Sequence, residues 1–289
     1  MESRRIQSVG KGSYSISLPK GWIIHNHLRE KDLVFIENIN NNLIISTRNF
    51  SSNKNAISVN YKEIKNLKEF IRMCYIKGVN RIKINFVNKT ERESESIRDI
   101  LGRFNGYDIS NEDAQSIEIS FLFKDVDIDL EKIMRREIYL INLMLEQLKK
   151  KNFEELKKLE NSVDSLNNLS KKILFMCLEN KTLSKDNQIK DSYLIYTYLE
   201  LIRRLERVAD CIFSLMEEDY SHVDLKNLGG IISFLDNVVK IKKEESEELN
   251  KYVFNSNNRN VDIILKKLQH NFESIRDILE VLEMDKSFF

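Results

Sequence analysis

The chain has 289 residues, of which 31% are charged and 42% hydrophobic, with one proline and eight glycines, a mixture typical of a folded, largely helical protein. Its formal net charge of +1 excludes a broadly basic nucleic-acid binder and leaves room only for a local basic surface. No apolar run approaches the roughly 18 residues of a membrane span and no signal peptide is recognisable, so the sequence predicts a cytoplasmic protein without membrane insertion.

Residues 4–46 form the first predicted unit. Polar and apolar residues alternate over Ser13–Leu18, which is the period of a strand, and Pro19 then opens a short helix. A hairpin follows across an asparagine-rich turn, with its strands at 33–37 and 43–46. Four short strand segments and one helical turn bury little surface, so this unit is expected to form an obligate homodimer.

The order of motifs in this unit resembles that of a known family. Arg-Arg-Ile-Gln precedes a Gly-Lys-Gly-Ser loop, and Ser-Ile-Ser-Leu-Pro-Lys-Gly-Trp and Lys-Asp-Leu-Val-Phe-Ile follow. Over most of residues 4–46 this pattern is similar to the AbrB/SpoVT family of swapped-hairpin DNA-binding domains. The resemblance implies a dimeric, interleaved β barrel that presents basic residues to DNA. By position these residues are Arg4, Arg5, Lys11 and Lys20.

The four basic residues are a local surplus, because residues 1–20 contain only one acid, Glu2. Such a surplus suits contacts with DNA phosphates. The alternative is a solvated basic edge that keeps the strands from pairing with another chain.

A polar stretch from Thr47 to Asn55 is expected to be a linker. The pattern beyond it predicts a small α/β region, with strands at 57–60, 81–86 and 116–123 and helices at 63–77 and 91–104. Gly78 and Gly106 stand where each helix is expected to stop. Because no glycine-rich phosphate loop or nucleophile elbow occurs here, the region is interpreted as a structural spacer, with binding of a small effector as the alternative.

From Asp127 onward the chain is predicted to form long helices separated by polar breaks, one of them at Asn180–Gln188. The predicted helices run over 129–150, 153–179, 190–219, 224–254 and 259–284. Long helices joined by short turns lie antiparallel, which predicts a bundle. The chain is therefore expected to be multidomain and mainly α. The expected domains are a DNA-binding and dimerisation unit over 1–48, an α/β domain over 56–125 and the bundle over 127–289.

One helix carries the most informative pattern in the chain. Between Tyr193 and Asp219 a broad apolar stripe recurs at about 100° per residue, and it comprises Ile195, Leu199, Ile202, Leu205, Ala209, Ile212, Phe213 and Met216. Glu206 lies inside the stripe, and Asp210 follows one turn later at its edge beside Arg203. A carboxylate in a packing face is costly unless it is paired, hydrogen-bonded or bound to a metal, so the two acids mark a candidate site.

The preceding helix repeats this arrangement. Glu160 and Asp164 occupy the margin of its apolar stripe with the same spacing as Glu206 and Asp210. If the two helices are antiparallel neighbours, four carboxylates meet on one face of the bundle, where they repel one another and favour a bound cation such as Mg, Mn, Fe or Zn. The alternative is that these acids are solvated or paired with lysine, because many acid pairs at this spacing arise by chance.

The acidic motifs also resemble a known family. Leu205-Glu-Arg-Val-Ala-Asp210, preceded by Arg203-Arg204, is similar to the Leu-Glu-Arg-Ile-Gly-Asp motif of the PhoU phosphate-uptake regulators, and Glu160-x-x-x-Asp164 is similar to its companion. In that family the carboxylates bind metal clusters on an antiparallel helical bundle, and the protein restrains a phosphate transporter and its signalling kinase. An AbrB-like unit before a PhoU-like bundle resembles the archaeal members.

The second half of the bundle departs from this family pattern. Glu273 and Asp277 have the correct spacing but lie further from the apolar face of their helix, and valine and alanine replace isoleucine and glycine in the central motif. These two acids are therefore either solvated or part of a second metal site.

The motifs together predict a homodimeric transcription regulator of phosphate uptake, not an enzyme. It is expected to bind DNA through its first unit and a divalent or ferric ion through its bundle. One alternative is an adaptor that acts on a phosphate ABC transporter or its signalling proteins without binding DNA. A carboxylate-bridged metalloenzyme is the other alternative, and it lacks support because His222 and His270 do not form the Glu-x-x-His pattern of di-iron bundles.

Overall fold

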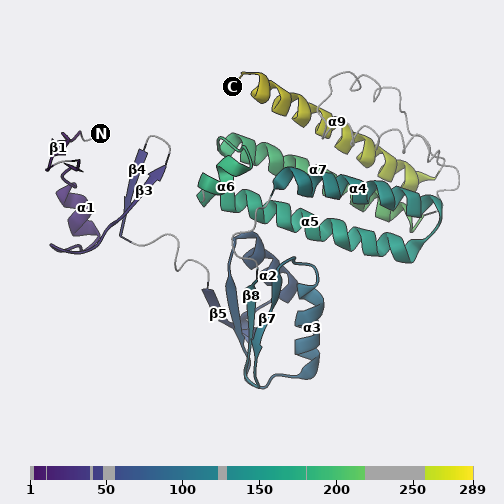
Figure 1. Cartoon of the computed structure of the whole chain (residues 1–289). Helices are drawn as coiled ribbons and strands as arrows, with labels where there is room; N and C mark the ends of the chain where they lie inside the picture. The colour runs from purple at the N-terminus through teal and green to yellow at the C-terminus, as the bar shows by residue number, and fades with distance from the viewer. Residues whose placement is uncertain are drawn as a thin grey trace. The chain divides into compact units, whose positions relative to one another are not determined.

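A computed structural model describes residues 3–10, 12–39, 42–47, 56–122, 129–179, 181–218 and 258–288. It is mainly helical with small sheets, as predicted (Figure 1). Its contacts divide the chain into two compact units, Met1–Lys54 and Asn55–Phe289. The predicted helix at 224–254 and the candidate DNA-binding residue Lys11 lie outside the described residues.

The first unit contains four short strands and one helix. Strands β1 and β2 pair antiparallel, as do β3 and β4, and helix α1 lies between the two hairpins in the chain. Their bounds are Gln7–Ser8, Tyr14–Ser15, Phe35–Ile39 and Asn42–Ser46 for the strands and Lys20–His25 for the helix. The predicted strand over Ser13–Leu18 is thus shortened to its first half, and α1 begins directly after Pro19 as expected.

This unit has little core of its own. None of its residues is buried among those whose side chains the structure describes, and large apolar side chains such as Leu33 and Tyr14 are 82% and 76% exposed. Apolar surface of this extent on so small a unit is typical of a surface that another chain covers.

The second unit begins with a four-stranded sheet in the order β5-β6-β8-β7. Strand β5 pairs parallel with β6, and helix α2 connects the two in the chain. The other neighbouring strands pair antiparallel. The strands span Ala56–Asn60, Arg81–Asn85, Tyr107–Glu112 and Ser116–Phe121, and the helices α2 and α3 span Leu67–Ile76 and Glu91–Leu101. The isoleucines of the central strands β6 and β8 are fully buried beneath the two helices.

The elements of this sheet differ from the prediction in three ways. Strand β7 was not predicted, because it lies at the edge of the sheet and only Tyr107 and Ile109 interrupt its polar sequence. Helix α2 starts later than expected because the Asn66 side chain accepts a hydrogen bond from the backbone of Glu69 and caps it. Helix α3 ends at Leu101, before the predicted residue 104. Helix α2 ends as predicted just before Gly78, whose φ of +72° is a conformation that favours glycine.

Long helices make up the rest of the unit. They are α4 (Leu130–Lys149), α5 (Phe153–Glu179), α7 (Ser192–Leu215) and α9 (Arg259–Phe288), with the short helix α6 (Lys181–Asp186) inside a predicted break. Helices α4, α5 and α7 pack together around one apolar core, and α9 packs on α7 (Figure 1). None of the helices in the described part of the chain is both long and apolar enough to cross a membrane.

Helix α5 joins the bundle to the sheet domain. Leu169 packs against both apolar cores, and α5 contacts α2. The ammonium group of Lys172 is buried in this contact, 4.0 Å from the ring centre of Phe121 and 4.8 Å from that of Tyr75. One side of α5 therefore belongs to the junction with the sheet domain.

Candidate cation site in the helical bundle

The predicted apolar stripe of α7 is buried. Asp191 caps the helix by accepting a hydrogen bond from the backbone of Leu194 at 2.9 Å, and Ile202, Leu205 and Ala209 are almost completely inaccessible to solvent. Glu206 on the same helix keeps 32% of its side chain exposed. It therefore lies at the margin of the core rather than within it.

Three of the four predicted carboxylates on α5 and α7 have raised pKa values. Burial and the charge of Asp164 raise the pKa of Glu160, and burial and the charge of Glu206 raise the pKa of Asp164. Asp210 is exposed as a residue, yet the partial burial of its carboxyl and the charges of Glu206 and Asp164 raise its pKa to about 6. These mutual effects require that the acids of the two helices lie near one another.

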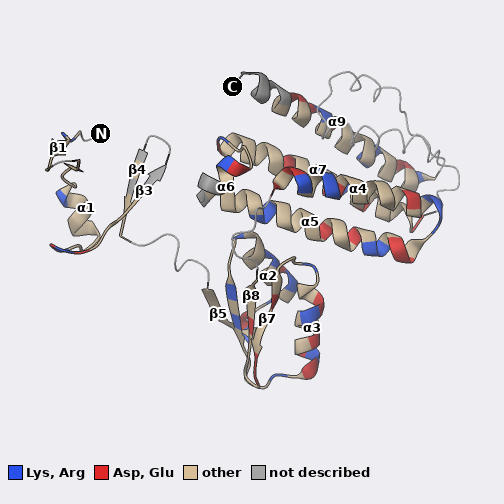
Figure 2. Ribbon diagram, viewed as in Figure 1, with Lys and Arg blue, Asp and Glu red and all other residues tan. Residues whose placement is uncertain are grey.

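A lysine already neutralises part of this charge. The Nζ atom of Lys171 on α5 lies 2.8 Å from Oε2 of Glu206, with 16% of the lysine side chain exposed. Arg203, which the sequence placed beside Asp210, instead pairs with Glu200 at 2.9 Å. Acidic and basic residues thus intermix along α5 and α7 (Figure 2).

A fifth carboxylate was missed in the sequence. Glu137 on α4 is fully buried, and the charges of Glu206 and Asp164 add to the effect of burial to raise its pKa to about 8. Its Oε1 atom accepts a long hydrogen bond of 3.4 Å from Asn167, whereas Oε2 has no partner in the structure. Glu137 lies between Met134 and Ile141 on the buried face of its helix, so the criterion that marked Glu206 would also have marked this residue.

The carboxylate oxygens are suitable ligands for a hard cation, but the side chains are too far apart to coordinate one in this arrangement. Carboxylate oxygens are the preferred ligands of Mg and Mn and are accepted by Fe and Zn. Among the residues that the structure describes, however, no three His, Cys, Asp or Glu side chains stand close enough together to hold a metal ion. A bound metal would require the four acids to draw together and Glu206 to exchange Lys171 for the metal.

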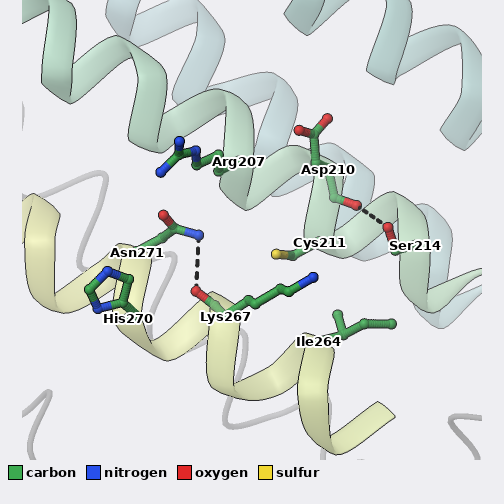
Figure 3. A pocket seen from close by; sticks show the side chains of 8 residues that line it. All are labelled: Arg207, Asp210, Cys211, Ser214, Ile264, Lys267, His270 and Asn271. Atoms are coloured by element: carbon green, nitrogen blue, oxygen red, sulfur yellow. Dashed lines mark hydrogen bonds between the residues drawn. The ribbon is translucent and has the colours of Figure 1, made fainter. Parts of the chain in front are cut away.

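Asp210 also borders a cleft of about 410 Å³ between α7 and α9 (Figure 3). Cys211 and His270 line this cleft with Lys267. Burial raises the pKa of the Cys211 thiol to about 11, so the sulfur stays protonated at neutral pH and is a poor metal ligand or nucleophile.

The second acidic pair has a solvated environment. Glu273 is exposed and accepts a hydrogen bond from Gln269, and Asp277 is exposed and lies 3.2 Å from Arg276. The structure therefore favours the solvated alternative for this pair.

The candidate DNA-binding residues Arg4, Arg5 and Lys20 are all exposed in the first unit. Arg4 and Arg5 precede β1, and Lys20 is the first residue of α1. Their side chains are accessible to a large ligand.

The chain was compared with known proteins on the basis of sequence and fold. No family model, no curated protein and no solved structure matches it.

Proposed function

We propose that this chain is a homodimeric, DNA-binding transcription regulator of phosphate uptake, and that a cation at its helical bundle acts as the sensor or relay. The resemblance of residues 4–46 to AbrB/SpoVT domains supports DNA binding. The resemblance of the acidic motifs to those of PhoU regulators supports the link to phosphate.

We base this on one observation: burial and the charges of neighbouring acids raise the pKa values of Glu160 and Asp164 on α5 and of Asp210 on α7, at the margin of the bundle core. Glu160, Asp164, Glu206 and Asp210 would hold the cation, which would be divalent or ferric. Its positive charge would offset their repulsion.

The first unit supports the dimeric part of the proposal. Its exposed apolar side chains need a covering surface, and a second copy of the chain supplies one of equal size and composition. The exposed positions of Arg4, Arg5 and Lys20 leave these cations accessible to DNA phosphates.

Chromatin immunoprecipitation from phosphate-rich and phosphate-starved cells tests this function. The proposal predicts enrichment of a few specific promoter fragments, with an occupancy that changes with phosphate supply. If no fragment is enriched while the chain is recovered with a phosphate transporter or its signalling proteins, the adaptor is the correct function and the DNA-binding proposal is wrong.

A further inference from the structure

An open cleft of about 550 Å³ lies between the sheet domain and the bundle. The start of α2 and the turn after α3 form one wall, and α5 and α7 form the other. Its volume is within the range of small-molecule sites, which often lie between domains.

The cleft has more cationic than acidic side chains. Five basic residues line it, against the three acids Glu69, Asp164 and Glu206, and the basic residues are Lys68, Arg72, Arg103, Lys171 and Arg203. Arg203 is already paired with Glu200, which does not line the cleft. If the other seven groups are ionised, four basic residues face three acids and leave a surplus of one positive charge.

Two of these cations have no close partner. Arg72 pairs with Glu69 at 2.7 Å, and Lys171 pairs with Glu206 at 2.8 Å. The side chains of Lys68 and Arg103, in contrast, make no hydrogen bond or ion pair with any described residue, although both lower the pKa of Asp164 from a distance. Arg103 is half-buried and Lys68 is exposed.

We propose that this cleft binds one phosphate group, either as inorganic phosphate or as the phosphoryl group of a small metabolite, through Arg103 and Lys68. A phosphate monoester carries about −1.5 to −2 charge at neutral pH, which can offset the two positive charges of Arg103 and Lys68. The planar donor array of arginine fits phosphate oxygens, and lysine adds a point charge. The N-terminus of α2, at Asn66 on the same wall, favours an anion further.

The three acids of the lining argue against a nucleic-acid backbone as the ligand. A polyanion would bring several phosphates near Glu69, Asp164 and Glu206, whereas one compact phosphate can contact the cations alone. This site does not require a metal at the neighbouring carboxylates, although Asp164 and Glu206 border both regions.

Calorimetric titration of the full chain tests the proposal. The protein is first treated with a chelator and placed in a low-salt buffer without phosphate or sulfate, and inorganic phosphate, AMP and adenosine are titrated separately. Binding of phosphate or AMP without binding of adenosine is expected, and the relative affinities of the first two distinguish free phosphate from a phosphorylated metabolite. Absence of binding by both, or binding of adenosine equal to that of AMP, would overturn the proposal.

Matched charge variants locate the site. Arg103→Gln and Lys68→Gln should each weaken binding by about tenfold or more, the usual loss when a charge-assisted hydrogen bond is removed. Arg92→Gln and Lys65→Gln remove the same charges from exposed positions of the same domain that do not line the cleft, and they should leave the Kd within about twofold. If the cleft variants and the control variants weaken binding equally, and all keep the wild-type melting temperature, the binding is non-specific electrostatic attraction and the proposed site is wrong. The titrations are done after chelation, so a failure to bind phosphate would not contradict the cation site at the four carboxylates, which has a separate test.

Discussion

Glu137 is the residue whose environment is least favourable for its ordinary charge. This residue of α4 is fully buried, its Oε2 atom has no hydrogen-bond partner among the described residues, and the charges of Glu206 and Asp164 disfavour its ionised form. Its folded-state pKa of about 8 lies above the ordinary value of 4.5, so the folded chain retains a proton that the unfolded chain releases. Its stabilising contribution is complete below about pH 4.5 and is lost as the pH rises towards 8.

Glu137→Gln should therefore flatten the dependence of stability on pH. The variant cannot ionise, so its melting temperature should exceed that of the wild type above pH 8, by about 2 °C or more for each 1 kcal/mol gained. Thermal melts from pH 5 to pH 9, with the exposed Glu146→Gln on the same helix as control, measure this difference. If the melting temperatures of wild type and Glu137→Gln change with pH in parallel, the carboxyl of Glu137 is not buried in its neutral form.

At the scale of elements, α5 has two functional sides. One side presents Glu160 and Asp164, and another inserts Lys172 among the rings of Tyr75, Tyr107 and Phe121. Burial lowers the pKa of Lys172 to about 8 from 10.5, and the interactions with the aromatic rings offset part of the desolvation cost. The same helix therefore connects the acidic face of the bundle to the sheet domain.

Lys172→Met tests the packing of this junction. Because the folded pKa of Lys172 is depressed, wild-type stability should rise as the pH increases from about 8 to 10.5, and the variant should lack this rise. At pH 7 methionine should stabilise the chain by about 1 kcal/mol or more, since it removes a buried charge without a carboxylate partner. Chemical denaturation at pH 7, about 8 and 10.5 measures both effects. A strongly destabilised Lys172→Met would mean that the ammonium group is essential to the junction.

The strands and helix of the first unit are expected to depend on a second copy of the chain. Removal of residues 1–50 should abolish the homodimer, because none of the described residues in this unit is buried. Light scattering of the full chain and of a chain that starts near Ser51 gives the two masses. If both have the same oligomeric mass, the first unit is not the dimerisation unit.

The basic start of this unit is expected to contact DNA. Arg4→Ala combined with Arg5→Ala should abolish the gel shift of a fragment recovered by immunoprecipitation, because phosphate contacts supply much of the affinity. The homodimer should persist, and Arg29→Ala at another exposed position of the unit should bind DNA as the wild type does. Undiminished binding by the double variant would favour the adaptor.

The sequence allowed prediction of the elements that depend on local pattern. The long helices and the central strands are periodic, and Glu206 was notable because it interrupts a stripe. The ion pair of Lys171 with Glu206 depends on how α5 and α7 are aligned, and the cleft at Lys68 and Arg103 depends on how two domains dock. Neither arrangement leaves a pattern along the chain.

At the scale of the whole molecule, the chain combines a first unit whose described side chains are not buried and a larger unit with two apolar cores. The first unit needs another surface to cover its apolar side chains. The second carries three acids whose pKa values are raised by burial and by neighbouring negative charges. A cation that binds only the folded bundle would stabilise it by mass action.

The most direct test of this account is the melting temperature of the bundle with and without metal. Wild type, Asp164→Asn/Asp210→Asn and Glu273→Gln/Asp277→Asn are melted after chelation and again with Mg, Mn, Fe or Zn. The first double variant preserves the ion pair of Lys171 with Glu206, and the second removes an equally spaced but exposed acidic pair. We predict that metal raises the melting temperature of the wild type and of Glu273→Gln/Asp277→Asn by several degrees. Asp164→Asn/Asp210→Asn should be at least as stable as the metal-free wild type and gain nothing from metal. The same metal-dependent shift in all three proteins, or no shift in the wild type with any of these ions, would contradict a cation site at the four carboxylates.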